Sequence, residues 1–201
     1  MKRTRITVIV LGSLLFLVSP GLVVGQETPD NYFVAKLGLY NPTGDLDDAK
    51  FESSGNIELI YGHYFSPKFV LEGGLGMFHA EGGETSEAKL LFTDRDLTAP
   101  GIVVTPKFIH RTGKWEVFGG GGVGIYRPRL EVYYLAPSVP NFDETETAYG
   151  IHALGGATYD VAPSWYLGFE AKYIWISEVD FDGIELDLNG YMLLFDIGHR
   201  F

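Results

Sequence analysis

Residues 191–201, Tyr-Met-Leu-Leu-Phe-Asp-Ile-Gly-His-Arg-Phe, alternate between large apolar side chains and others that include charged and small ones. Successive side chains of a β-strand point to opposite faces. One face of this stretch would carry Tyr191, Leu193, Phe195, Ile197 and Phe201. The opposite face would carry Asp196, Gly198 and Arg200, in line with the preceding Gly190. The pattern predicts a strand that separates an apolar environment from a polar one.

The same period of two recurs along the chain, and no stretch after residue 25 keeps the 3.6-residue apolar period of a helix over a useful length. Each segment is close to the length of about 9–11 residues that a tilted strand needs to cross a bilayer. Pro106 cannot donate to a ladder, so it predicts a bulge or an irregular rim. The eight predicted strands cover residues 32–41, 56–65, 69–79, 102–110, 115–126, 148–161, 165–176 and 188–201.

The charged residues of these strands all share one face, and the other face carries no Asp, Glu, Lys or Arg. A soluble sandwich or lipocalin would place its apolar face inside and its charges in water. Here one face is small and charged and the other is broad and aromatic, which favours a polar interior and a lipid-facing exterior. The charged set is Lys36, Glu58, Glu72, Lys107, Glu116, Asp160, Glu170, Lys172, Asp196 and Arg200.

Short and long connections alternate between the predicted strands. Tight turns fall at residues 66–68, 111–114 and 162–164, and long loops at about 42–55, 80–101, 127–147 and 177–187. Outer-membrane barrels place short turns in the periplasm and long loops outside. The sequence therefore predicts an all-β fold: an eight-stranded antiparallel up-and-down transmembrane β-barrel with both chain ends on the short-turn side.

The first 25 residues have the layout of a secretory signal peptide. Lys2, Arg3 and Arg5 precede an apolar run from Ile6 to Val18, and short residues follow a Pro-Gly break. That run is short for a membrane-spanning helix, which needs about 20 apolar residues, although a retained signal anchor is the alternative. We expect cleavage near residue 25 and a barrel domain over residues 26–201.

Composition excludes several classes of function. Residues 1–25 hold three basic residues and no acidic one, so the remaining chain keeps 12 Lys and Arg against 26 Asp and Glu, a formal charge of −14. Nucleic-acid binding requires clustered cations, so we expect no nucleic-acid partner. Cysteine is absent, which excludes disulfides, thiolate metal sites and a lipoprotein anchor. We expect no cofactor and no metal centre.

The chain resembles the family of small bacterial outer-membrane β-barrels that includes the OmpA barrel, OmpX, OmpW and the opacity-type surface proteins. The resemblance extends over nearly all of residues 26–201. Its most specific part is the final strand, which resembles the signal read by the barrel-assembly machinery, although His199 departs from the usual aromatic or aliphatic residue. The residues that carry this signal are Tyr191, Phe195, Ile197, Gly198 and Phe201. The family implies outer-membrane lipid and lipopolysaccharide, the assembly machinery and periplasmic chaperones as partners.

Nine of the charged strand residues, all but Asp160, form a candidate lumen network. Eight strands enclose an interior just wide enough for side chains to fill. Four cations can pair there with five carboxylates, which would satisfy buried charge and hold the lumen closed. A narrow or gated pore is the alternative. The network comprises Lys36, Glu58, Glu72, Lys107, Glu116, Glu170, Lys172, Asp196 and Arg200.

The long loops are acidic, which indicates solvated loops or carboxylates that bridge through divalent cations to lipopolysaccharide phosphates. Three other motifs are weak. The glycines at 119, 121 and 124 fit a dinucleotide fingerprint without its strand-turn-helix context. Residues 185–196 approach an EF-hand loop but lack flanking helices and the usual residues at both ends. His79 with Ser86 would suit a lipid-modifying enzyme, but no orienting carboxylate is indicated.

These observations predict a non-enzymatic integral outer-membrane protein with a structural or surface role, exported through a cleaved signal peptide. Two alternatives stay open. One is a narrow OmpW-like channel for small, hydrophobic solutes. The other is a lipid A-modifying barrel enzyme. No catalytic or cofactor-binding residue is predicted.

Overall fold

The computed structural model describes residues 30–82, 92–134 and 141–201. The predicted signal peptide, residues 1–25, lies outside the described residues. Among those that are described, no helix is both long and apolar enough to cross a membrane.

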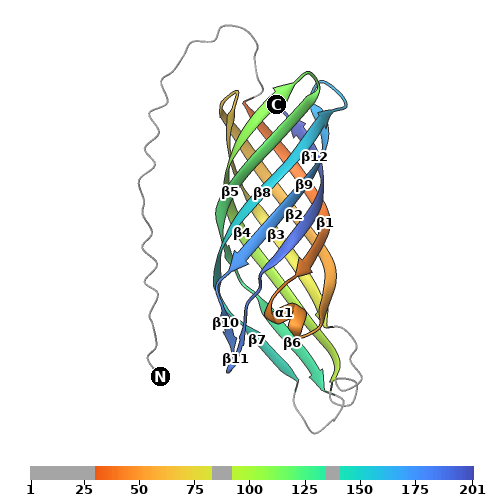
Figure 1. Ribbon diagram of the computed structural model, residues 1–201, viewed down its shortest axis with the longest axis vertical. Helices are drawn as coiled ribbons and strands as arrows, with labels where there is room; N and C mark the ends of the chain where they lie inside the picture. The colour runs from red at the N-terminus through yellow and green to blue at the C-terminus, as the bar shows by residue number, and fades with distance from the viewer. Residues whose placement is uncertain (1–29, 83–91, 135–140) are drawn as a thin grey trace, which may run out of the picture.

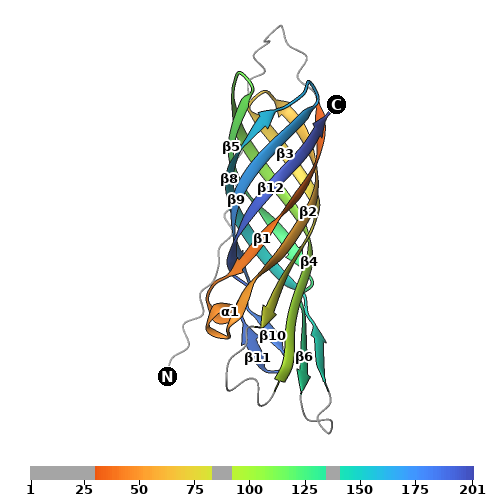
Figure 2. The same cartoon turned by 90° about the vertical axis from the view of Figure 1, so that its right-hand side faces the viewer.

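Eight long antiparallel strands close into a barrel, which confirms the predicted fold (Figure 1). Each pairs with the next barrel strand along the chain, and the first and last pair with each other to close the sheet (Figure 2). The barrel strands are β1 (Asn31–Pro42), β2 (Phe51–Ser66), β3 (Phe69–Gly82), β4 (Phe92–Thr112), β5 (Trp115–Tyr126), β8 (Ala148–Asp160), β9 (Trp165–Ile176) and β12 (Gly190–Arg200).

The register of β1 shows how alternation sorts the two faces. Lys36 lies opposite Asp196 of β12 and Glu58 of β2, and all three side chains are buried. The neighbouring Phe33 and Leu37 on β1 are each more than half exposed. Charged residues therefore line the interior and apolar residues the exterior, as the polar-in, lipid-out interpretation requires.

Short turns and long connections lie at opposite ends of the barrel. Both ends of the described barrel, Asn31 and Phe201, lie at the short-turn end, where each backbone N–H donates to the other's carbonyl. Gly113 makes the tight β4–β5 turn possible, because its φ of 62° is rarely adopted by residues with a side chain.

The strands extend beyond the predicted segments at the loop end. β4 begins ten residues before the predicted strand, and its first part pairs with β6 (Arg129–Tyr134), which in turn pairs with β7 (Phe142–Thr145). The predicted loops at 42–55 and 80–101 were therefore too long. Inward side chains such as Leu97 and Leu130 are buried there, so the sheet keeps an apolar core outside the predicted membrane span.

Two smaller elements close the loop end of the barrel. The short helix α1 (Asp45–Asp48) follows β1, and the hairpin of β10 (Val179–Phe181) and β11 (Ile184–Leu186) follows β9 (Figure 1). Each sends one fully buried side chain into the core, Leu46 from the helix and Phe181 from the hairpin.

The expectation of a bulge at Pro106 was wrong. Pairing of β4 with β3 runs without a shift through Pro106, which lies opposite Leu71. On the other side, Val104 pairs with Val123 and Lys107 with Gly120, so the register is the same before and after the proline. The missing N–H leaves a local gap in the ladder without displacing the strand.

Aromatic side chains gather at the two ends of the barrel's outer face. At the short-turn end, Trp115 packs on Tyr159 with ring centroids 5.0 Å apart, and Phe33 stacks on Phe201 at 5.4 Å. Toward the loops, Tyr173 and Trp175 lie 4.6 Å apart. Membrane proteins place such aromatic belts at both membrane interfaces.

Candidate functional site: the barrel interior and its acidic rim

Seven of the eight barrel strands contribute to the nine predicted lumen charges. All nine side chains point inward, and none is more than 7% exposed. The period of two is the local cause, because every second residue of each strand faces the interior. The structure divides these charges into two clusters and one carboxylate that stands apart.

The central cluster joins two lysines and two carboxylates from four strands. Glu170 Oε2 lies 2.7 Å from Lys36 Nζ and 2.8 Å from Lys107 Nζ. Glu72 completes the arrangement, with Oε2 2.9 Å from Lys107 Nζ and 3.8 Å from Lys36 Nζ. Tyr32 also donates its hydroxyl to Glu72 at 2.5 Å. Each buried charge thus has at least two polar partners, as a stable buried network requires.

Lys172 and Glu58 extend this cluster toward the loops. Lys172 Nζ donates to both carboxylate oxygens of Glu58, at 2.6 and 2.7 Å, and lies 3.6 Å from Glu170 Oε1. Further along, Thr105 and His152 form a hydrogen bond of 2.8 Å. The cations and carboxylates therefore form one continuous cross-link through the middle of the barrel.

A second cluster closes the short-turn end around Arg200. Its guanidinium donates to Tyr64 at 3.2 Å and to Asp160, and it lies 3.5 Å from Glu116. Arg111 binds the same Glu116 oxygen at 2.5 Å and donates to the Tyr64 hydroxyl at 2.9 Å. The two arginines and their partners fill the mouth of the barrel at the short-turn end.

Asp196 stands apart from both clusters. Among the described residues, neither its Oδ1 nor the nearby Thr158 Oγ1 has a hydrogen-bond partner. Both residues line a cavity of about 10 Å³, together with Lys36 and Glu72. A cavity of that size accommodates about one water molecule.

The two interior cavities that described residues bound are each too small for a solute. A second cavity, also of about 10 Å³, lies between Glu58, Lys172 and Phe78. Toward the loop end from this cavity, the ring centroids of Tyr40 and Phe78 lie 4.3 Å apart, and those of Phe78 and Tyr126 lie 6.0 Å apart. The lumen is thus filled by ion pairs in its middle and toward the short-turn end, and by apolar side chains toward the loop end.

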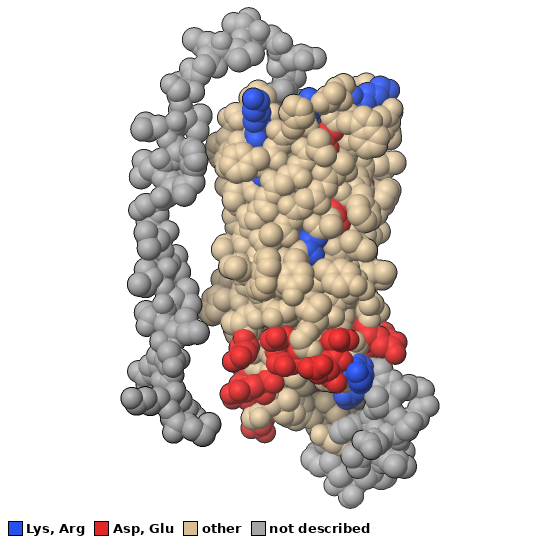
Figure 3. Space-filling model, viewed as in Figure 1, with Lys and Arg blue, Asp and Glu red and all other residues tan. Residues whose placement is uncertain are grey.

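Acidic residues gather at the loop end of the barrel, where Figure 3 shows a red band below the tan wall. Asp45 and Asp187 join two loops reciprocally, because each carboxylate accepts from the other's backbone N–H, at 3.3 and 3.1 Å. The described residues include no group of three or more side chains that could hold a metal ion.

Arg129 is a cation within this acidic rim, and it braces the β6–β7 hairpin. It donates to both carboxylate oxygens of Asp143, at 2.8 and 2.6 Å, and lies 2.8 Å from Glu131. The hydrogen bonds from Arg129 hold the pKa of Asp143 below its ordinary value.

Two of the three weaker motifs find no support in their surroundings. The glycines at 119, 121 and 124 lie within β5, which β6 follows rather than a helix. Within the EF-hand-like stretch, Asp187 binds Asp45, Asn189 accepts from the Ile176 N–H, and Asp196 faces the lumen. His79 Nδ1 lies 3.2 Å from the Thr98 hydroxyl, and its Nε2 lies 3.4 Å from Glu81 and 3.7 Å from Asp96, so carboxylates do stand beside this histidine. Its suggested partner Ser86 is outside the described residues.

Sequence reasoning missed the polar aromatic residues of the interior. Tyr32 and Tyr166 lie 6.0 Å apart at the short-turn end, and Arg200 lies over the Tyr166 ring at 4.3 Å. Both share the inward parity of the charges, which was the available signal. Arg111 was assigned to a turn, yet it completes the cluster around Glu116.

The assembly-signal residues divide between the two faces of β12. Their apolar members face outward, with exposed fractions between 42% and 52%, and Gly198 faces inward beneath the Tyr166 ring. The outward members are Tyr191, Phe195, Ile197 and Phe201.

Comparisons with known proteins agree with this architecture. The family model described as "Outer membrane protein beta-barrel domain" matches residues 9–201. The crystal structure of Neisserial surface protein A (NspA) superposes with a TM-score of 0.60 at 15% identity, covering 86% of this chain and 97% of that one. Ail, the attachment invasion locus protein of Yersinia pestis, superposes with a TM-score of 0.52 at 13% identity, covering 87% and 100%. No curated protein sequence matches significantly.

Proposed function

This chain belongs to the outer-membrane protein β-barrel family, and from that premise we propose that it is a non-enzymatic, non-conducting barrel that presents an acidic platform at the cell surface. The barrel serves as a rigid anchor, and the loop end carries the interaction. No catalytic step is assigned to any of its residues.

The closed interior is the observation that carries this proposal. Three buried lysines and three buried carboxylates cross-link the lumen at 2.6–3.8 Å, and the neighbouring cavities are each about 10 Å³. A hydrated ion or a small solute would have to displace side chains that are themselves held by buried ion pairs. This arrangement supports a closed barrel over the narrow channel.

The acidic rim supports a partner that brings phosphate. Carboxylate and phosphate oxygens are the usual ligands of Ca²⁺ and Mg²⁺. We therefore propose that divalent cations bridge the loop carboxylates to phosphates of neighbouring lipopolysaccharide. The reciprocal Asp45–Asp187 contact and the Arg129–Asp143 pair support it, because ordered loops lose less conformational entropy on binding.

The route to the membrane is part of the same proposal. Residues 1–25 would direct export and be cleaved, and periplasmic chaperones would hold the chain in transit. The barrel-assembly machinery would then read the outward apolar residues of β12.

Single-channel recording tests the proposal directly. The refolded protein over residues 26–201 is added to a planar bilayer, and the Lys36→Ala/Lys107→Ala variant, which removes two lumen cross-links, is recorded in parallel. We expect no discrete steps from the wild type. Reproducible steps from wild-type protein that is shown to be folded would establish the channel instead, and the variant shows whether the assay detects an opened lumen.

A further inference from the structure

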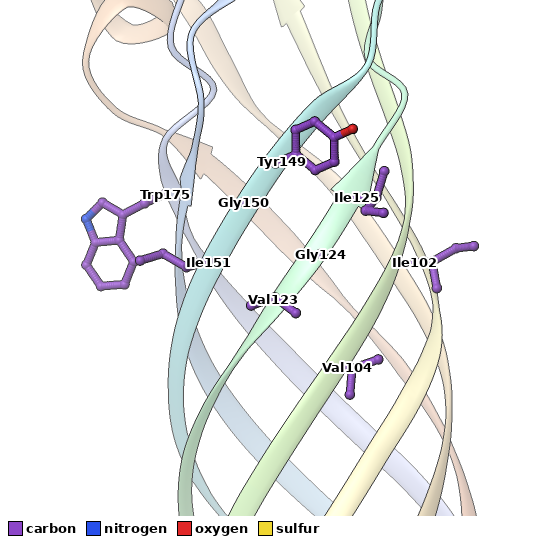
Figure 4. Close-up of a pocket in the computed structure, with 9 residues that line it drawn as sticks. All are labelled: Ile102, Val104, Val123, Gly124, Ile125, Tyr149, Gly150, Ile151 and Trp175. Carbon is purple, nitrogen blue, oxygen red and sulfur yellow. The ribbon is translucent and has the colours of Figure 1, made fainter. Parts of the chain in front are cut away.

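A groove of about 580 Å³ runs along the outer wall of the barrel over β4, β5, β8 and β9 (Figure 4). Its volume falls in the range of about 300–1,000 Å³ that small-ligand sites occupy. The side chains that shape it are Ile102, Val104, Val123, Ile125, Tyr149 and Trp175.

The groove arises from a contrast in side-chain size. Val123 and Ile125 of β5 form a low floor, continued by the backbone of Gly124 and Gly150, which pair across β5 and β8. The ring of Trp175 rises at one edge and that of Tyr149 at the loop end (Figure 4). Trp175 belongs to the loop-side aromatic belt, so the groove opens into the outer leaflet.

A cation stands at the loop end of this groove. Arg127 follows β5 and is exposed, between the inward Tyr126 and the buried Pro128. Its backbone N–H donates to the Pro100 carbonyl at 2.8 Å, so the strand pairing continues to this residue. Arg127 lies two residues beyond Ile125, or about 7 Å along the strand direction. No ion pair of Arg127 occurs within the described residues. Arg129, in contrast, is already bound to Asp143 and Glu131.

An apolar groove that ends near an exposed arginine, with no ion pair to that arginine from the described residues, fits a molecule with an apolar tail and an anionic head. A second copy of the chain fits less well, because a two-fold contact centred on the groove would bring Arg127 close to its own counterpart. Like charges at such a contact oppose association.

We propose that this groove binds one acyl chain of a phosphorylated outer-leaflet lipid, with Arg127 holding its phosphate. The inference rests on the outer-membrane placement of the barrel and adds a specific lipid site to the proposed function. It is independent of whether the lumen conducts.

Native mass spectrometry tests the site with two probes: bis-phosphorylated lipid A, and a diacylglycerol of matching chain length without phosphate. Val123→Phe fills the groove floor. Val117→Phe is its matched control, on the outward face of the same strand and outside the groove. We expect one lipid A retained per wild-type barrel, about tenfold lower occupancy for Val123→Phe, and no change for Val117→Phe. Ile102→Trp fills the groove from β4 and serves if Val123→Phe does not fold.

The headgroup contact is tested separately. Arg127→Gln should lower lipid A occupancy to the level of the diacylglycerol, whereas Arg129→Gln should not. Equal retention by the wild type and the groove-filling variants overturns the site, as does a dimer that Val123→Phe dissociates. In either case, a folded barrel that gives no conductance steps still supports the proposed function. Failure of the lipid site and failure of the proposed function can therefore be distinguished.

Discussion

Lys172 and Glu58 meet inside the barrel, with Lys172 Nζ 2.6 and 2.7 Å from the two carboxylate oxygens of Glu58. The residues are 114 positions apart, on β9 and β2, and both are almost completely buried. Such a pair stabilises the fold only while both partners are present, because a lone buried charge is costly.

Lys172→Met should therefore destabilise the barrel by about 3–5 kcal/mol, the cost of leaving one partner of a buried pair uncompensated. Urea unfolding in detergent micelles, followed by tryptophan fluorescence, gives the free energy of unfolding. Lys68→Met, in the exposed β2–β3 turn, is the control and should change little. Adding Glu58→Gln to Lys172→Met should recover part of the loss. An unchanged midpoint for Lys172→Met would contradict a stabilising lumen network.

Gly198→Ala should destabilise the barrel, because a Cβ there would overlap the ring of Tyr166. Forcing an extra methyl group into a packed site costs about 1–3 kcal/mol. Gly73→Ala is the matched control, since a Cβ at Gly73 meets nothing within 4 Å. The same urea titration measures both variants. Equal stabilities would show that the tyrosine ring is free to move aside.

Deletion of Phe201 should lower the amount of folded protein in the outer membrane, because the residue ends the outward apolar row of β12. It also removes the backbone bonds to Asn31, at 3.1 and 2.9 Å. Heat-modifiable mobility on gels of outer-membrane fractions measures the folded amount. Phe201→Tyr keeps an aromatic ring and should assemble normally. Wild-type levels of the deletion variant would argue against a C-terminal assembly signal.

Acid should loosen the β6–β7 hairpin. The pKa of Asp143 is lowered in the folded protein by its hydrogen bonds from Arg129. The pair therefore stabilises the hairpin above the ordinary pKa of an aspartate, and this stabilisation is lost as the pH falls through the folded pKa. Hydrogen exchange of the Val132 amide at several pH values, corrected for the intrinsic rate, reports this change. Arg129→Gln should abolish the pH dependence; if it persists, another group is responsible.

Most of the fold could be predicted from the alternation of apolar and other residues, in the zone where one face of each strand contacts lipid. Between Phe33 and Leu39, or Tyr191 and Ile197, every outward residue had to be apolar, so strand and face could both be read. Leu97 and Leu130 lie beyond that zone at the loop end, where outward residues are polar and the alternation of apolar residues weakens. The extension of β4 was therefore predicted as a loop.

The sequence predicts which residues face the interior, but it does not predict which of them form ion pairs with each other. Parity identifies Lys36, Lys107 and Glu170 as inward, but which of them meet depends on the stagger of strands that are distant in sequence. Leu46 is a single buried residue in an acidic loop, and the alternation of buried Val179 and Phe181 extends over only three residues, too few to predict a strand. The outer groove depends on the relative sizes of side chains on four neighbouring strands, which periodicity along the sequence does not predict.

The β1–β12 pairing has a kinetic consequence. Every other pairing in the barrel joins consecutive barrel strands through a turn or loop much shorter than the whole chain, whereas this seam joins residues as distant as Tyr32 and Arg200. Bringing such distant segments together costs chain entropy before the stabilising contacts between them have formed. The slow step of folding should therefore be the closure of this one seam, and substitutions there should slow folding more than equivalent ones within a hairpin.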